Sequence, residues 1–377
     1  MHSFELGPIR PPSEAYSLLI RATRNCSWNR CKFCHTYKGK KFQLRPVEDI
    51  KEDIRIAKAI HNEIKELSWK SGYDGRIRET ATMMLNNPPS EAYYNVAMWL
   101  YYGGESAFLQ DANSLIMKTN ELTDTIKFLK ESFPDIKRIT SYARSKTAAK
   151  KSPDELTELC SSGLTRLHIG LESGYDPLLN YMDKGVTAAE QITGGRKVVE
   201  SGISLCEYVI LGLGGEDKWR EHAIQTAMVL NEIDPAFIRV RTLTVNHGMS
   251  LYDEIENNNF VRATDDKIVK EEKLFISHLN CHSTYVSDHI TNLLQEVEGI
   301  LPQDKEKMLA IIDKFQTLPA EEKINFRIGR RTGVYNQLDD LNDSGKRQVV
   351  KQLKHRLGLN GEQPDEKRIS RIMERFI

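Results

Sequence analysis

The chain has 377 residues, and its 53 Lys and Arg residues equal its 53 Asp and Glu residues in number. This length allows one large core, alone or with an appendage. Because the charge is balanced, no overall field recruits nucleic acid or an acidic membrane, and we expect neither as a partner. The N-terminal residues lack the pattern of a secretion signal, and no apolar run approaches the ~18 residues of a membrane span, so we expect a cytoplasmic protein.

Strand-like runs recur at helix-sized intervals over the first two thirds of the chain. They cover residues 17–25, 98–105, 138–144, 166–173, 205–216 and 236–245. Amphipathic segments with apolar residues three and four apart lie between several of them, as in residues 152–163, 187–202 and 217–233. Six strand-then-helix units in succession predict an α/β fold with a parallel sheet and helices outside it.

Two further segments are helical in pattern. The insertion at residues 46–96 is longer than one crossover helix requires, and it forms either a lid or substrate wall or simply two surface helices. After residue 245 a turn-rich region leads into helices and a charged helical tail that includes residues 365–377. We therefore predict a core domain over residues 1–245 and a mostly helical C-terminal extension over residues 246–377.

Three of the six cysteines, Cys26, Cys31 and Cys34, lie within nine residues in the segment CSWNRCKFCH. Its right end matches a CxxCH haem attachment site, but haem attachment requires export. Structural zinc usually takes two pairs of ligands, and no second pair follows. Three thiolates also suit an iron–sulfur cluster with one iron open to another ligand, which is the reading we favour. Cys160, Cys206 and Cys281 stand far apart, as expected of buried small side chains.

Polar or glycine residues occur at the carboxyl end of every predicted strand. In chain order they are Cys26 onward, Gly103 to Glu105, Arg144, Glu172 with Ser173, Gly212 to Glu216, and Arg241 to Thr244. Barrel-like α/β folds build their sites at this rim, so we expect these residues to converge on one mouth.

The cysteine motif after the first strand, followed by the GGE motif at residues 103–105, resembles the radical S-adenosylmethionine (radical SAM) superfamily over residues 17–245. The segment HIGLESG at residues 168–174 resembles the branch that includes the methylthiotransferases and the Elongator catalytic subunit. The spacing CxxxxCxxC has one residue more than the common family motif. The resemblance implies a partial (β/α)6 barrel, a 4Fe-4S cluster held by Cys26, Cys31 and Cys34, and SAM bound to the fourth iron.

The resemblance also implies roles for individual residues. Phe33 would lie beside the adenine of SAM, and the strand ending in Glu172 and Ser173 would approach its ribose and methionine. The glycines Gly103 and Gly104 would permit a close approach of the backbone, and Glu105 would accept hydrogen bonds from the amine. Arg144 would pair with a carboxylate of SAM or substrate, Gly212 would lie near the adenine, and Arg241 would complete the cofactor site.

The implied reaction is reductive cleavage of SAM to methionine and a 5′-deoxyadenosyl radical, which removes hydrogen from a substrate carbon. We expect an oxygen-sensitive enzyme with a small-molecule substrate and an electron donor such as flavodoxin or ferredoxin. His282, Asp288, His289 and Asn292 are candidate substrate contacts or surface residues without a role. The alternatives are a radical SAM enzyme that modifies RNA, a non-catalytic iron–sulfur electron-transfer or sensor protein, and a zinc-stabilised binding module.

Overall fold

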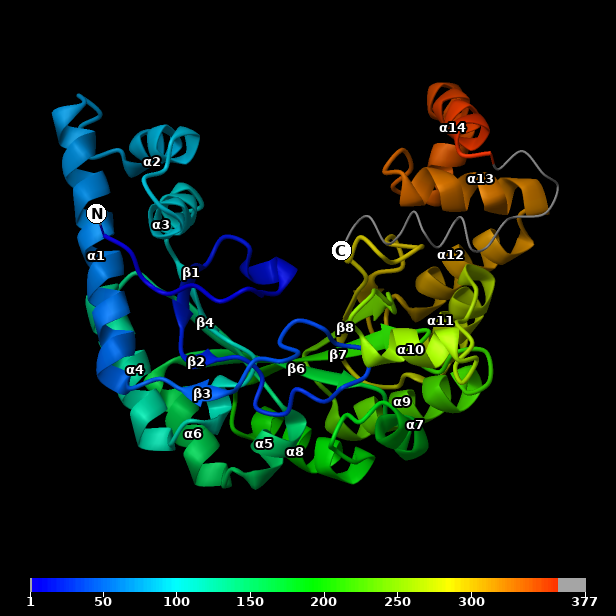
Figure 1. The fold of residues 1–377 in the computed structure, drawn as a ribbon, viewed down its shortest axis with the longest axis horizontal. Coiled ribbons are helices and arrows are strands. Elements are labelled where there is room, and N and C mark those ends of the chain that lie inside the picture. The colour runs from blue at the N-terminus through cyan, green and yellow to red at the C-terminus, as the bar shows by residue number, and fades with distance from the viewer. Residues whose placement is uncertain (1, 359–377) are drawn as a thin grey trace. The chain divides into compact units, whose positions relative to one another are not determined.

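A computed structural model describes residues 2–358 of the chain (Figure 1). Eight strands form a mostly parallel sheet in the order β1-β4-β5-β6-β7-β8-β9-β10, and β2 and β3 form a separate antiparallel pair. This arrangement confirms the predicted α/β fold class. The last residues of the predicted charged tail, 359–377, lie outside the described part of the chain. None of the helices within residues 2–358 is long and apolar enough to span a membrane.

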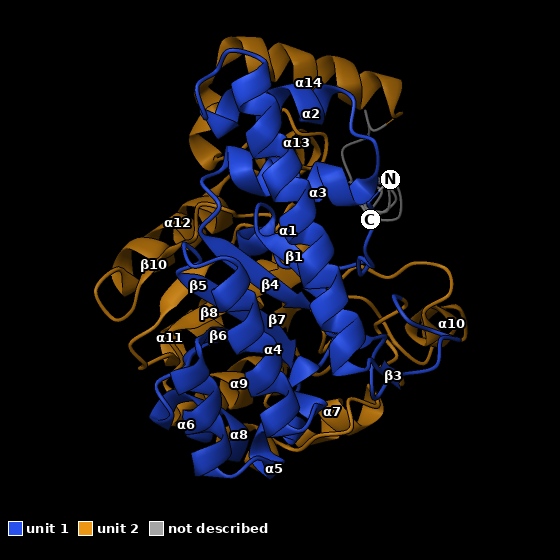
Figure 2. Cartoon of the chain, turned by 90° about the vertical axis from the view of Figure 1, so that its left-hand side faces the viewer, with its two compact units in different colours: residues 1–29, 36–170, 193–205 blue, residues 30–35, 171–192, 206–377 orange. Residues whose placement is uncertain are grey.

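The chain divides into two compact units, coloured separately in Figure 2. Unit 1 contains residues 1–29, 36–170 and 193–205, and unit 2 contains residues 30–35, 171–192 and 206–377. The predicted boundary at residue 245 between a core domain and an extension stays a prediction.

In unit 1, neighbouring strands of the main sheet pair in parallel, so their carboxyl ends lie at one edge. These strands are β1 (Leu18–Arg21), β4 (Ser106–Gln110), β5 (Arg138–Ala143) and β6 (Leu164–Glu172), of which residues up to 170 belong to this unit. The separate antiparallel pair consists of β2 (Thr23–Arg24) and β3 (Gln43–Leu44). The helices are η1 (Pro12–Glu14), α1 (Val47–Lys70), α2 (Ile77–Asn86), α3 (Glu91–Tyr101), η2 (Ser114–Ile116), α4 (Thr119–Ser132), α5 (Ser145–Lys150), α6 (Pro153–Ser162) and, from residue 193, α8 (Ala188–Glu200).

In unit 2, β7 (Ser204–Leu211, from residue 206 in this unit), β8 (Phe237–Thr242) and β9 (Thr284–Val286) pair in parallel, and β10 (Gly299–Ile300) is antiparallel to β9. The helices are α7 (Asp176–Tyr181), α9 (Trp219–Ile233), α10 (Ser250–Glu256), α11 (Asp265–His278), α12 (Lys305–Thr317), α13 (Ala320–Arg331), η3 (Leu338–Asn342) and α14 (Ser344–Arg356). Helices α9 and α11 pack against each other.

The prediction of a strand over residues 98–105 was wrong. Helix α3 continues to Tyr101, with Ser90 capping its first turn by accepting the N–H of Tyr93. Gly103 and Gly104 end the helix in left-handed conformations, with φ of 103° and 70°. The strand begins only at Ser106. The GGE motif therefore lies at the amino end of β4, opposite to the edge where we expected it.

The segment after Asn280 was expected to belong to a mostly helical extension, but it adds β9 and β10 to the sheet. Both strands are short, three and two residues, which leaves too little alternation for a pattern to be recognised. Because β9 is parallel to β8, the loop after β9 follows the carboxyl end of a strand, at the same edge as the ends of β7 and β8.

Candidate cofactor site

The backbone around Cys26 in unit 1 is held in shape by two asparagines. Asn25 and Asn29 both adopt left-handed conformations, with φ of 66° and 53°, which asparagine tolerates better than most residues. The N–H of Asn29 donates to Cys26 Sγ at 3.4 Å, and its side chain donates to the carbonyls of Tyr37 and Lys40. The loop that carries Cys26 is therefore fastened to the segment that follows it.

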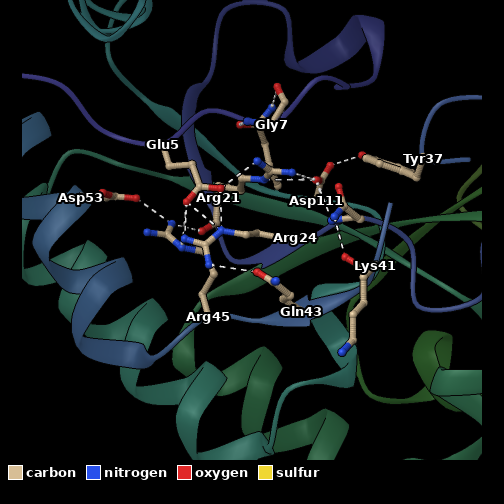
Figure 3. A network of polar contacts seen from close by, with 12 residues as sticks. Glu5, Gly7, Arg21, Arg24, Tyr37, Lys41, Gln43, Arg45, Asp53 and Asp111 are labelled. Carbon is tan, nitrogen blue, oxygen red and sulfur yellow. Dashed lines mark hydrogen bonds and ion pairs between the residues drawn. The ribbon is translucent and has the colours of Figure 1, made fainter. Parts of the chain in front are cut away.

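A buried carboxylate, Asp111, anchors this loop to the carboxyl end of β4 (Figure 3). Its Oδ2 accepts from Arg21 Nη2 at 2.7 Å and from the N–H of Asn25 at 3.2 Å, while its Oδ1 accepts from the Tyr37 hydroxyl. Burial and the charge of Asp111 raise the pKa of Tyr37, so that hydroxyl stays protonated. Sequence reasoning missed Asp111 because the second strand had been placed too early.

Asn113 continues this arrangement toward β5. Its Nδ2 donates to Ser27 Oγ at 3.0 Å and to Thr147 Oγ1 at 2.9 Å, and its Oδ1 accepts the N–H of Arg144 at 3.2 Å. The guanidinium of Arg144 lies 5.1 Å from the centroid of the Trp28 ring, within cation–π range. The structure thus brings the predicted residue Arg144 to the loop that contains Cys26.

In unit 2, Cys31 and Cys34 border an apolar cluster that contains Phe33 and residues at the ends of β7 and β8. The cluster consists of Phe33, Leu178, Met182, Ile210, Leu213, Leu243, Val245, Met249, Leu251 and Phe260. The backbone of Lys32 is hydrogen-bonded to two residues of this cluster: its N–H donates to Met182 O, and its carbonyl accepts the N–H of Leu251, both at 2.9 Å. Two of the cysteines therefore lie against the carboxyl ends of two parallel strands.

Glu172, the last residue of β6, has a strained and incompletely satisfied position. Its φ of 65° is rare for a residue with a Cβ, and such outliers cluster at functional sites. One carboxylate oxygen, Oε1, lies 3.1 Å from Lys184 Nζ, which in turn lies 5.8 Å from the Phe33 ring centroid. The other, Oε2, is buried without a hydrogen-bond partner in the described structure. It is therefore available to a ligand hydroxyl or ammonium group.

Ser173 and Gly212 are held in place by contacts with two buried residues, His222 and Glu271. Ser173 Oγ lies 2.9 Å from His222 Nδ1, whose other ring nitrogen lies 3.0 Å from Ile210 O. The N–H of Gly212, where φ is 81°, donates to Glu271 Oε1 at 2.7 Å. Burial lowers the pKa of His222 to about 4 and raises that of Glu271 to about 8, so both are neutral near pH 7. Neither residue was singled out in the sequence.

The thiols suit an iron–sulfur cluster by their chemistry. None of the three is in a disulfide, each is partly exposed, and the segment from Cys26 to Cys34 contains no carboxylate. Cys26 belongs to unit 1, whereas Cys31 and Cys34 belong to unit 2. Within residues 2–358, no three His, Cys, Asp or Glu side chains stand close enough together to hold a metal ion. Ligation by all three thiols thus stays a prediction.

Three other predicted residues, Glu105, His282 and Asn292, have side chains that contact other residues of the protein. The Glu105 side chain is 56% exposed and pairs with Lys137 at 2.6 Å, beside the amino ends of β4 and β5 and not at the expected carboxyl edge, and its contact with the SAM amine stays a prediction. His282 precedes β9, and its Nδ1 lies 3.4 Å from Asp234 Oδ2 on the surface, so it does not face a site at the carboxyl ends. Asn292 is buried and hydrogen-bonds the backbone of Thr242 and Val240. Its contacts make it structural.

The fold and these residues define an α/β protein whose cofactor-binding candidates, thiols among them, follow the carboxyl ends of parallel strands. No family model matches the chain. Over 150 residues it is 23% identical to an uncharacterized protein of Methanocaldococcus jannaschii, a match that covers 40% of this chain and 46% of the relative. The matched segment thus spans less than half of that relative.

The chain is also similar to parts of two solved structures. Elp3 of Methanocaldococcus infernus is 13% identical over 62% of this chain and 60% of its own, with a TM-score of 0.44. TsrM of Kitasatospora setae, a radical S-adenosylmethionine methyltransferase with cobalamin and a 4Fe-4S cluster bound, is 15% identical over 64% of this chain and 37% of its own, with a TM-score of 0.43.

Proposed function

We propose that the protein is a radical SAM enzyme that acts on a small molecule. The observation that carries the proposal lies in unit 2, where Cys31 and Cys34 border the apolar cluster at the carboxyl ends of β7 and β8. A structural zinc site would not explain why the cysteines border the carboxyl ends of two strands. An electron-transfer protein would not explain the strained Glu172, whose buried Oε2 has no hydrogen-bond partner in the described structure.

Cys26, Cys31 and Cys34 would hold a 4Fe-4S cluster and leave one iron for the amino and carboxylate groups of SAM. When bound, the cluster supplies one electron that cleaves SAM to methionine and a 5′-deoxyadenosyl radical. The N–H of Asn29, which donates to Cys26 Sγ, would stabilise thiolate character at that ligand.

The other residues would bind and orient SAM. Glu172 Oε2 would accept a hydrogen bond from the ribose or the amine, because this buried oxygen has no other donor in the described structure. Phe33 would pack beside the adenine, and Ser173 and Gly212 would line the same region. Arg144 at the end of β5 would pair with a carboxylate. The apolar cluster around Phe33 would exclude water from the reaction.

The electron donor would be an acidic protein such as a flavodoxin or a ferredoxin. Between Glu14 and Glu48 the sequence contains no Asp or Glu, although the whole chain is neutral. The same stretch holds eight cationic residues: Arg21, Arg24, Arg30, Lys32, Lys38, Lys40, Lys41 and Arg45. Arg21, Arg24, Lys32 and Arg45 are paired with carboxylates. The exposed cations Arg30, Lys40 and Lys41 therefore carry the positive charge near the cysteines that favours a negatively charged partner.

The test is anaerobic. The protein is reconstituted with iron and sulfide and mixed with SAM and a strong reductant, and 5′-deoxyadenosine is measured by mass spectrometry. We expect it with the wild type and with Cys160→Ala, which removes a thiol outside the motif, and not with Cys34→Ala. A cluster that assembles without cleaving SAM would favour an electron-transfer or sensor protein, and a colourless zinc protein would favour the binding module. Co-purification of RNA would favour RNA modification.

A further inference from the structure

One face of β8 carries two arginines. Phe237, Arg239 and Arg241 alternate with the buried residues Ile238 and Val240, so the two arginines point to the same side of the sheet. In the register with β7, Arg239 pairs with Tyr208, and its guanidinium carbon lies 6.0 Å from the Tyr208 ring centroid. Arg241 is two residues further along, near the carboxyl end of the strand.

The loop after β9 provides the other side of this region. Asp288 Oδ2 lies 3.2 Å from Arg239 Nη1, which gives that arginine a counterion. His289 is close enough to Arg241 for electrostatic interaction, and burial lowers its pKa to about 4, with Arg241 contributing. His289 is therefore neutral near pH 7. Two cations and one anion face each other here, and the positive charge in excess is that of Arg241.

Arg241 has no hydrogen bond or ion pair from its side chain within the described residues, and it is only partly exposed. The neighbouring imidazole presents a donor as well. Because His289 Nδ1 accepts the N–H of Thr291 at 3.3 Å, the proton of the neutral ring is on Nε2. A guanidinium fork and an N–H group are the donors that recognise a carboxylate or a phosphate.

The two sides are fixed to one another before any ligand binds. Asn292 Oδ1 accepts the N–H of Thr242 at 2.7 Å, and its Nδ2 donates to Val240 O at 2.9 Å and to Ser287 Oγ at 3.0 Å. Arg331 of α13 donates to Thr291 O. Arg241 and His289 are thus held on a rigid support, as a binding site requires.

We propose that the substrate carries a carboxylate or phosphate group that binds Arg241 and His289 Nε2–H, a proposal that rests on the proposed function. Arg239, already paired with Asp288, forms the wall of this anion site. The assignment replaces the expected role of Arg241 as a SAM contact. All residues of this site lie in unit 2, and Asp288 and His289 belong to the part of the chain after residue 245.

The test measures thermal unfolding of the full chain in inorganic phosphate, in acetate and in chloride at matched ionic strength. We expect phosphate or acetate to raise the wild-type Tm above its value in chloride, and the more effective anion to identify the group. Arg241→Gln should weaken the apparent anion affinity about tenfold or more. Arg241→Lys should retain part of the response, and Arg220→Gln, an exposed control in the same unit, should retain all of it.

SAM affinity of the reconstituted variants completes the test. We expect Arg241→Gln to bind SAM within about twofold of the wild type. A Tm response that is equal in the wild type and Arg241→Gln would overturn the anion site, and a large loss of SAM affinity would return Arg241 to the cofactor. Failure of the wild type to cleave SAM, with the anion response intact, would overturn the proposed function alone.

Discussion

Ser173 Oγ lies 2.9 Å from Nδ1 of His222, a histidine that is 1% exposed. Since Ile210 O can only accept, the proton of His222 is on Nε2, and Nδ1 accepts from the hydroxyls of Ser173 and Thr226. A residue predicted to contact SAM is therefore positioned by a buried neutral imidazole.

His222→Gln tests this support. Burial lowers the pKa of His222 from 6.5 to about 4, so between these pH values the unfolded chain binds a proton that the folded chain does not. Folding stability contributed by this residue is present above pH 6.5 and is lost as the pH falls toward 4. Chemical denaturation from pH 4 to 7 should show a shallower pH dependence for His222→Gln than for the wild type. Equal slopes would contradict the buried neutral state.

Glu271→Gln should show the opposite dependence. Burial raises the pKa of Glu271 from 4.5 to about 8, with Glu272 adding to the shift and the N–H of Gly212 opposing it. The folded chain keeps a proton that the unfolded chain loses, so stability is lost as the pH rises from 4.5 to 8. Glutamine keeps an acceptor for Gly212 and has no charge. The variant should gain stability over the wild type as the pH increases, and a constant difference would argue against the raised pKa.

Glu172 and Glu105 form a matched pair of carboxylates with opposite expectations. Glu172→Gln should weaken SAM binding about tenfold, because a charged acceptor at the end of β6 is lost. Glu105→Ala should leave SAM binding unchanged, since Glu105 is exposed and paired with Lys137 at the amino end of β4. Equilibrium dialysis with reconstituted protein measures both. Loss of binding in Glu105→Ala would restore the role that the GGE motif suggested.

Asp111→Asn should loosen the loop that carries Cys26. Asp111 is fully buried and accepts hydrogen bonds from Arg21, Asn25 and Tyr37, whereas Arg21 keeps its ion pair with Glu5, so the change should cost about 2 kcal/mol of unfolding free energy. Iron content after reconstitution should fall as well. Asp124→Asn, which weakens the pair between the exposed Asp124 and Lys51, is the control and should change stability by less than about 1 kcal/mol. Full iron occupancy in Asp111→Asn would show that the network does not support the cluster.

The sequence predicted most of the strands because buried parallel strands are continuous apolar runs between amphipathic helices. The strand predicted over residues 98–105 was wrong because a helix with apolar residues around Trp99 that ends in two glycines has the same sequence pattern as a strand with a glycine-rich end. That error hid Asp111 and Asn113, although both lie within four residues after the apolar run 107–109. His222 and Glu271 could not be recognised, because each lies on a helix whose neighbour across the fold was unknown.

The proposed function depends on a cluster that three thiols hold with one iron site open for SAM. Electron paramagnetic resonance of the reduced, reconstituted protein, recorded before and after addition of SAM, tests it most directly. We expect a 4Fe-4S signal whose shape changes when SAM is added to the wild type or to Cys160→Ala, and no such signal from Cys34→Ala. A signal that SAM leaves unchanged, or that persists without Cys34, would contradict the account.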